Sequence, residues 1–191
     1  MSQPEQRGPF VDFLSILRRS TDLLTDDPIR EEIFSVERLE HYATYLATEL
    51  QVSAKSKRGR SLLPELKQCG NDLLAAYLEL ATSIREKHAV SPAAEWFIDN
   101  FHIVEDQLRE IKQDLPANYY NELPKLAKGE LKGYPRVYSI ALAIIAHTDS
   151  RLDAETLKRF FKSYQQTAPL SIGELWAVAI TLRIALVEHL K

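Results

Sequence analysis

Residues 93–108 read AAEWFIDNFHIVEDQL, and this stretch predicts the middle of one long helix with two unlike faces. An apolar stripe follows helical steps of four and three residues, through Phe97, Phe101, Val104, Leu108 and Ile111. A polar stripe lies nearly opposite on a helical projection, and its members are Glu95, Asp99, His102 and Asp106. Trp96, Ile98 and Ile103 fill the flanks. The helix is therefore expected to run unbroken from Ser91 to about Gln113 and to be buried on more than one side.

The polar stripe is expected to be held inside the fold by other side chains. A covered carboxylate must be paired, because an unpaired charge is costly to keep away from water. Arg136 and Arg183 lie within otherwise apolar stretches. They are the expected partners of Glu95 and Asp99.

Composition limits the classes of protein that fit. The chain has 191 residues, a hydrophobic fraction of 45%, a charged fraction of 27% and a net charge of −3, as in soluble globular proteins. The charge gives no reason to expect a nucleic-acid partner, and the single cysteine, Cys69, has no internal disulfide partner. The polar start lacks a signal peptide. The longest apolar runs, 139–146 and 175–182, are too short to cross a bilayer, so we expect a soluble, cytoplasmic chain.

Capping residues predict four helix starts. Ser35, Ser91 and Asp153 each precede a run with helical apolar spacing, and their side-chain oxygens can accept from free backbone amides of the first turn. Ser171 and Glu174 form a capping-box pattern. The helix after Ser171 is expected to be buried almost all round. It runs to Lys191 without a stop signal, which suggests that the natural chain continues.

These patterns predict an all-α fold, a single helical bundle of about six or seven helices. An irregular segment rich in Pro, Gly and Tyr interrupts it at 116–134. Residues 1–27 are expected to form a flexible N-terminal arm, with a short helix near 10–17, and residues 28–191 to form the helical domain. A basic linker at 53–61 lies inside that domain. It fits a solvated loop better than a patch for anionic lipid or phosphate.

No catalytic or metal-binding residues are predicted. A di-metal bundle needs Glu-x-x-His pairs on two helices, and the chain has none. Two carboxylates on one helix face, such as Glu95 and Asp99, do not flank a glycosidic bond. Glycine-rich phosphate loops and nucleophile motifs are also missing. The candidates for ligand contact or an interface are the polar stripe and the aromatic residues with one arginine: Glu95, Trp96, Asp99, His102, Tyr119, Tyr120, Tyr134, Arg136 and Trp176. The aromatic residues can instead fill the core.

A series of short phrases carries a family resemblance. In chain order they are Phe34-Ser35-Val36-Glu37-Arg38-Leu39-Glu40, Ala93-Ala94-Glu95-Trp96 running into Asp99-Asn100-Phe101-His102, Asp114-Leu115-Pro116, Tyr119-Tyr120, Leu123-Pro124-Lys125-Leu126, Gly133-Tyr134-Pro135-Arg136-Val137-Tyr138, Ala146-His147-Thr148-Asp149 and Ile172-Gly173-Glu174-Leu175-Trp176-Ala177-Val178. Together, over residues 28–191, they resemble the N-terminal region of the cyclic β-1,2-glucan synthases, large bacterial inner-membrane proteins also called glycosyltransferase family 84.

The resemblance implies a parent that uses UDP-glucose to build and cyclise a β-1,2-linked glucan. It implies that this region precedes the membrane helices, faces the cytoplasm, and lacks the catalytic modules, which lie downstream. No catalytic residue and no cofactor is implied here. The expected partners are the downstream catalytic and membrane domains of the parent, and a glucan.

Two functions remain open. One is a non-catalytic scaffolding module that packs on the catalytic or membrane part of its parent. The other is a carbohydrate- or nucleotide-sugar-binding module that uses the aromatic residues and the polar stripe. An exposed apolar patch would favour the first. An open groove lined by Trp96, Tyr119 or Tyr134 would favour the second.

Overall fold

The computed structural model describes residues 32–53 and 59–191, and within these ranges the protein is all-α, as predicted. The described elements are α2 (Val36–Glu49), α3 (Leu63–Arg85), α4 (Pro92–Asp99), α5 (Phe101–Asp114), α6 (Ala117–Glu122), α7 (Arg136–Thr148), α8 (Ala154–Thr167) and α9 (Ile172–His189). The only β pairings among the described residues are two isolated bridges, Val52 with Leu126 and Lys125 with Pro135. The predicted N-terminal arm at 1–27, with its short helix at 10–17, and residues 54–58 of the basic linker lie outside the described residues.

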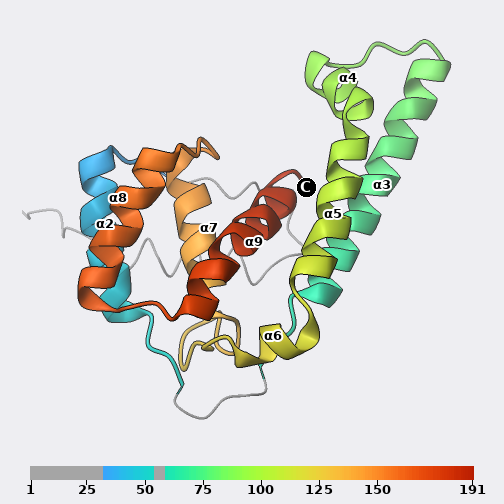
Figure 1. Ribbon diagram of the computed structural model, residues 1–191. Coiled ribbons are helices and arrows are strands. Elements are labelled where there is room, and N and C mark those ends of the chain that lie inside the picture. Colours follow the sequence, from blue (N-terminus) through green and yellow to red (C-terminus); the bar gives the residue numbers. More distant parts are fainter. Residues whose placement is uncertain (1–31, 54–58) are drawn as a thin grey trace, which may run out of the picture.

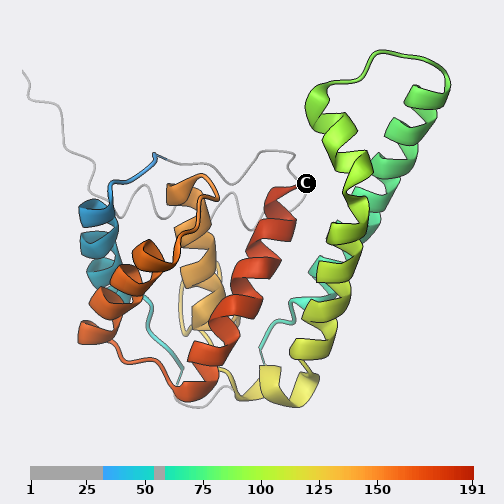
Figure 2. The ribbon, with the colours of Figure 1, turned by 45° about the horizontal axis from the view of Figure 1, so that its top comes forward.

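The helices form a body and a projecting hairpin (Figure 1). In the body, α2 packs against α8, and α7 packs against α9. The hairpin consists of α3, which leads outward, and of α4 and α5, which return. Its inner part rests on α9, and its tip extends past the body in both ribbon views (Figure 2). Helix α7 is the centre of the core, because each of its residues is buried.

The two sides of the hairpin approach closely at Gly70. A Cβ atom placed there would lie 3.0 Å from Cδ1 of Leu108 on α5, which is tighter than ordinary van der Waals contact. Further out, the rings of Tyr77 and Phe101 stack with centroids 4.5 Å apart. A glycine therefore lets the helix backbones meet, and an aromatic pair fills the wider space beyond.

The expected long helix from Ser91 to Gln113 is wrong, because the helix breaks at Asn100 into α4 and α5. The side-chain amide and the backbone N–H of Asn100 both donate to the carbonyl of Trp96, at 2.8 and 3.1 Å. Asparagine competes in this way with the regular helical hydrogen bonds. This break, and the short helix α6 inside the irregular segment, raise the count above six or seven.

The four predicted caps are confirmed. The side chains of Ser35, Ser91, Asp153 and Ser171 accept from backbone amides three residues further on, at 3.3, 3.2, 2.8 and 3.2 Å. At α9 the full capping box is present. Each cap satisfies an amide that the helix leaves unpaired.

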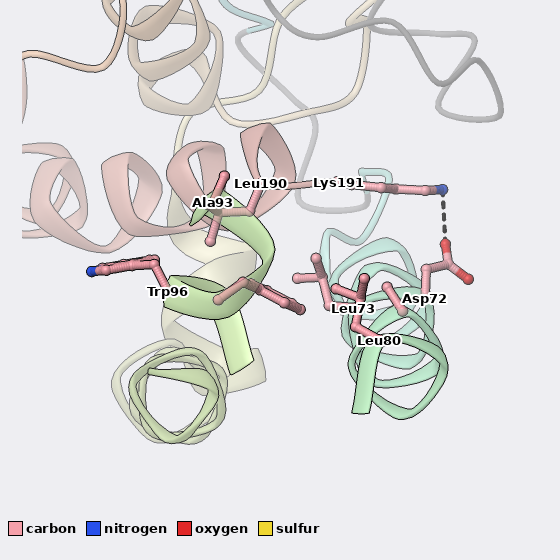
Figure 3. Close-up of a pocket in the computed structure, with 9 residues that line it drawn as sticks. Asp72, Leu73, Leu80, Ala93, Trp96, Leu190 and Lys191 are labelled. Carbon is pink, nitrogen blue, oxygen red and sulfur yellow. Dashed lines mark ion pairs between the residues drawn. The ribbon is translucent and has the colours of Figure 1, made fainter. Parts of the chain in front are cut away.

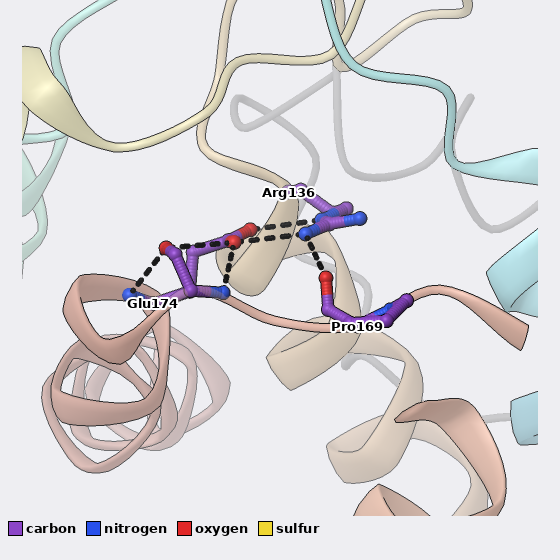
Figure 4. Close-up of polar contacts among 4 residues, drawn as sticks. Arg136, Pro169 and Glu174 are labelled. Atoms are coloured by element: carbon purple, nitrogen blue, oxygen red, sulfur yellow. Dashed lines mark hydrogen bonds and ion pairs between the residues drawn. The ribbon is translucent and has the colours of Figure 1, made fainter. Parts of the chain in front are cut away.

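A buried ion pair ties α7 to this capping box (Figure 4). Arg136 Nε and Nη2 donate to the two carboxylate oxygens of Glu174, both at 2.8 Å. Arg136 Nη2 also donates to the carbonyl of Pro169 at 3.2 Å. The Glu174 carboxylate accepts in addition from the backbone N–H and the hydroxyl of Ser171, at 2.9 and 3.0 Å. Both charged side chains are buried, so each depends on the other for its charge to be compensated.

The expectation that α9 is buried almost all round is correct only after its first turns. Ile172 and Trp176 are 72% and 73% exposed. They lie on the side of α9 opposite Glu174 and Ala177, which are buried. Among the described helices, α7, α5 and α3 contact α9, and none of them covers this outer side of its start.

Replacing Arg136 by Met should lower the free energy of unfolding by about 3–5 kcal/mol, because it leaves the Glu174 carboxylate buried without its cation. Urea unfolding followed by circular dichroism measures the change. The matched control is Arg183→Met, which removes an arginine that pairs with Glu110 and Asp114 at 3.3 and 3.4 Å near the surface. Exposed pairs contribute about 0–1 kcal/mol. Equal effects of the two substitutions would contradict a special role for the buried pair.

Candidate functional site

The polar stripe of the central stretch is not held inside the fold. Glu95, Asp99 and His102 are exposed, and Arg136 and Arg183 pair with Glu174, Glu110 and Asp114 instead. The prediction of buried partners is therefore wrong. The reason is that α4 and α5 belong to a projecting hairpin, which covers one side of these helices and leaves the other in water.

The tyrosines of the irregular segment close the junction between the hairpin and the body. Tyr120 and Tyr134 are buried. Tyr120 donates to the carbonyl of Arg60 at 2.5 Å, and Tyr134 donates to the Glu65 carboxylate. Tyr119 is half-buried and donates to the carbonyl of Gly173 at 2.6 Å. These hydroxyl groups hold neighbouring chain segments together.

A cleft of about 810 Å³ lies between the hairpin and the C-terminal end of α9 (Figure 3). Helices α3 and α4 and the end of the chain line it, with Asp72, Leu73, Ala76, Leu80, Ala93, Trp96, Phe97, Leu190 and Lys191. Its charged residues, Asp72 and Lys191, form an ion pair of 2.8 Å. The rest of the lining is apolar, so the cleft suits an apolar surface better than a polar ligand.

Of the candidate residues predicted from the sequence, the cleft contains Trp96 alone. The sequence patterns did not identify Leu73, Leu80 and Leu190 as lining residues. A local signal does exist, because Leu73, Ala76 and Leu80 share one face of α3 by their spacing. That spacing alone does not show that half of the face stays uncovered.

Large apolar side chains are exposed along the hairpin outside the cleft as well. Leu74 and Leu78 are one helical turn apart on α3, and Leu78 is 56% exposed. Ile84 and Ile103 are also exposed, and Trp96, which lines the cleft, is 60% exposed. Single exposed apolar residues are common on protein surfaces. Their concentration on one projecting element is typical of an interaction site.

Two carboxylates meet where the hairpin joins the body. Glu65 lies in the first turn of α3, and Glu188 lies in the last turn of α9. Tyr138 of α7 donates to Glu188 at 2.8 Å, and the Tyr134 and Tyr138 rings lie 5.6 Å apart. Burial raises the pKa of Glu188, the hydrogen bond from Tyr138 lowers it and the charge of Glu65 raises it, and together they place this pKa at about 7. Glu188 is therefore partly protonated at neutral pH.

Two other buried groups lie close to this junction. Burial raises the pKa of the Cys69 thiol to about 11, so the thiol stays protonated and unreactive. Burial lowers the pKa of Lys125 to about 8. The Lys125 amine donates to the carbonyl of Tyr120 and lies 4.0 Å from the centre of that residue's ring, which compensates part of its charge.

The described part of the chain contains no group of three or more His, Cys, Asp or Glu side chains that could hold a metal ion. Likewise, none of its described helices is long and apolar enough to cross a membrane.

Comparison with known proteins identifies a relative among the curated proteins. No family model matches the chain, and no solved structure matches it significantly. A curated protein of Rhizobium meliloti (strain 1021), the cyclic beta-(1,2)-glucan synthase NdvB, is 30% identical over 175 residues. The match covers 87% of this chain and 6% of that protein, so the chain corresponds to a small part of its relative.

Replacing Asp99 by Ala should leave the urea midpoint unchanged, because this carboxylate is exposed and bonds to no buried group. Glu174→Ala is the positive control, since it strands Arg136 in the core and should shift the midpoint strongly. Urea unfolding of the two variants beside the wild-type chain provides the comparison. A loss of stability in the Asp99 variant as large as in the Glu174 variant would restore the buried-stripe interpretation.

Proposed function

Since the chain is a relative of the cyclic β-1,2-glucan synthases, as its sequence phrases predict, we propose that it is a non-catalytic helical module of such a synthase. Its role is to pack on, and so to scaffold, the catalytic and membrane parts of the parent protein. Those parts are its proposed partners. The cytoplasmic side of the bacterial inner membrane is its proposed location, and it requires no cofactor of its own.

The apolar surface of the hairpin is the observation that supports docking best. Trp96 and Leu190 expose large side chains at the cleft, and Leu78 exposes one on α3 outside it. Apolar surface in water costs about 25 cal/mol per Å² relative to the same surface buried. A partner that covers these side chains gains that free energy, and a hairpin that extends past the body can reach into a groove of a second domain.

The proposal that the module does not itself transfer glucose rests on its sequence. The chain lacks the glycine-rich phosphate loops and nucleophile motifs of known catalytic sites. The donor sugar and the glucan would then be handled elsewhere in the parent protein.

The geometry of the cleft gives less support to the alternative, a carbohydrate- or nucleotide-sugar-binding module. Sugar sites place several polar groups around hydroxyls, usually beside an aromatic ring. The cleft does contain Trp96, but its charged residues, Asp72 and Lys191, pair with each other. Tyr119 and Tyr134, the other rings expected in such a groove, lie elsewhere.

The docking function predicts that charge on the hairpin surface abolishes association with the parent. The tagged chain should bind membranes that contain a cyclic glucan synthase from which the aligned region has been deleted. The double variant Leu78→Asp, Trp96→Asp should bind at least tenfold more weakly, because its interface would bury two unpaired carboxylates. Membrane co-sedimentation over a range of chain concentrations gives the affinity.

The control for this experiment is Thr44→Asp, which adds a carboxylate at an exposed position of α2, on the side of the body away from the hairpin (Figure 1). It should bind like the wild-type chain. Equal binding by the double variant would refute docking through the hairpin. Release of UDP from UDP-glucose by the purified chain would refute the non-catalytic role.

A further inference from the structure

Two acidic side chains face each other across the contact between the hairpin and the body. Glu65 belongs to α3, and Glu188 belongs to α9. Each accepts a hydrogen bond from one tyrosine, Tyr134 and Tyr138 respectively. The second oxygen of each carboxylate, Oε2 of Glu65 and Oε1 of Glu188, is buried without a hydrogen-bond partner. An ionised carboxylate in such surroundings is expensive, and two neighbouring ones are more so.

One of the two carboxylates has a cation beside it. Arg60 forms an ion pair with Glu65 at 3.7 Å, is half-exposed, and also lies over the Tyr134 ring, 4.3 Å from its centre. Cys69 and Asp72 of α3 face the end of α9. Asp72 forms an ion pair with Lys191. After Glu188, α9 ends at His189, and Lys191 is the second residue beyond it. Within residues 32–53 and 59–191, no cation pairs with Glu188.

The contact that contains this pair is one of two that attach the hairpin to α9, and the other joins α5 to α9. Cys69 Sγ lies 3.6 Å from the carbonyl oxygen of Val187, one residue before Glu188, and Leu66 and Leu73 are buried on the same face of α3. Separating α3 from α9 would admit water to both carboxylates. Separation would therefore relieve the cost of ionising them, while it exposes these apolar side chains.

We propose that the charge state of the Glu188 carboxylate, beside Glu65, controls the contact between α3 and α9. With Glu188 protonated, α3 stays packed against α9. With Glu188 ionised, this contact opens locally while the rest of the body remains folded. The cleft changes with it, because α3 supplies Leu73 and Leu80, and the chain after α9 supplies Leu190. The proposal does not rest on the proposed function, since it concerns the chain alone.

The direction of the effect follows from linkage. Burial in the closed state raises the pKa of Glu188 from the ordinary value of 4.5 to about 7. The closed state therefore has its full advantage below pH 4.5 and loses it as the pH rises through about 7. Above that range the loss is complete. Opening should thus increase between pH 5 and pH 8.

The native thiol reports the opening. Cys69 is buried in the closed contact and is the single cysteine of the chain, so a thiol reagent reaches it only when the contact opens. Its labelling rate, divided at each pH by that of an exposed cysteine peptide, should rise on the order of tenfold or more between pH 5.5 and pH 8. Glu188→Gln keeps an acceptor for Tyr138 and removes the charge, so its normalised rate should stay nearly flat.

Hydrogen exchange separates local opening from unfolding. Amides at the inner part of α3 and at the end of α9 should exchange faster at pH 8 than the intrinsic pH effect explains, whereas those of α2 and α8 should not. The matched control, Glu105→Gln, changes an exposed carboxylate of α5 and should follow the wild type. Should Glu188→Gln fail to fold, as judged by circular dichroism, Glu65→Gln replaces it and should reduce the rise.

Three results would overturn the proposal. They are a normalised labelling rate that does not change with pH, an equal rise in the wild type and in the variant used, and faster exchange of all helices together.

Discussion

The ion pair between Arg136 and Glu174 is the constraint on which the rest of the body depends. The two side chains are buried, each makes two bonds to the other, and neither has water to replace its partner. The pair joins the first residue of α7 to the first turn of α9, so it fixes where these two central helices begin relative to each other. Because α7 is buried on all sides, α2, α8 and α9 must then pack around this fixed axis. Ser171 belongs to the same network, so the start of α9 and its attachment to α7 form together.

The irregular segment has an equally specific packing. Lys125 is fully buried, and a Cβ atom at Gly59 would lie 2.2 Å from the carbonyl oxygen of Gly133. Gly133 itself has a φ of +88°, which glycine adopts without strain. The junction is therefore a place where buried polar groups hold non-helical chain in position. It contains the sequence phrases Leu123-Pro124-Lys125-Leu126 and Gly133-Tyr134-Pro135-Arg136. The physical role of these buried groups is structural.

What could be predicted from the sequence was local. Helix caps depend on residues three apart, so Ser35, Ser91, Asp153 and Ser171 marked their helices correctly, and the all-α class followed. The partners of Arg136 and Arg183 depend on which helices meet, and residue spacing does not contain that information. The interpretation of the central stretch was wrong for the same reason, since an apolar stripe fits both a buried helix and one side of a projecting hairpin. Asn100 was a weak signal for the break. The cleft could not be predicted from the sequence, because α3, α4 and the end of α9 form it together.

The close approach at Gly70 has a mechanical consequence. Gly70 is the narrow point of the hairpin, and about 22 Å of helix separate it from Arg85 at a rise of 1.5 Å per residue. The hairpin is thus held at its base beside α9, and its tip lies far from that support. A side chain at position 70 that pushed α5 away by a few tenths of an ångström would tilt the two helices, and the displacement would grow along their length. The position of the hairpin tip therefore depends on Gly70 having no Cβ atom.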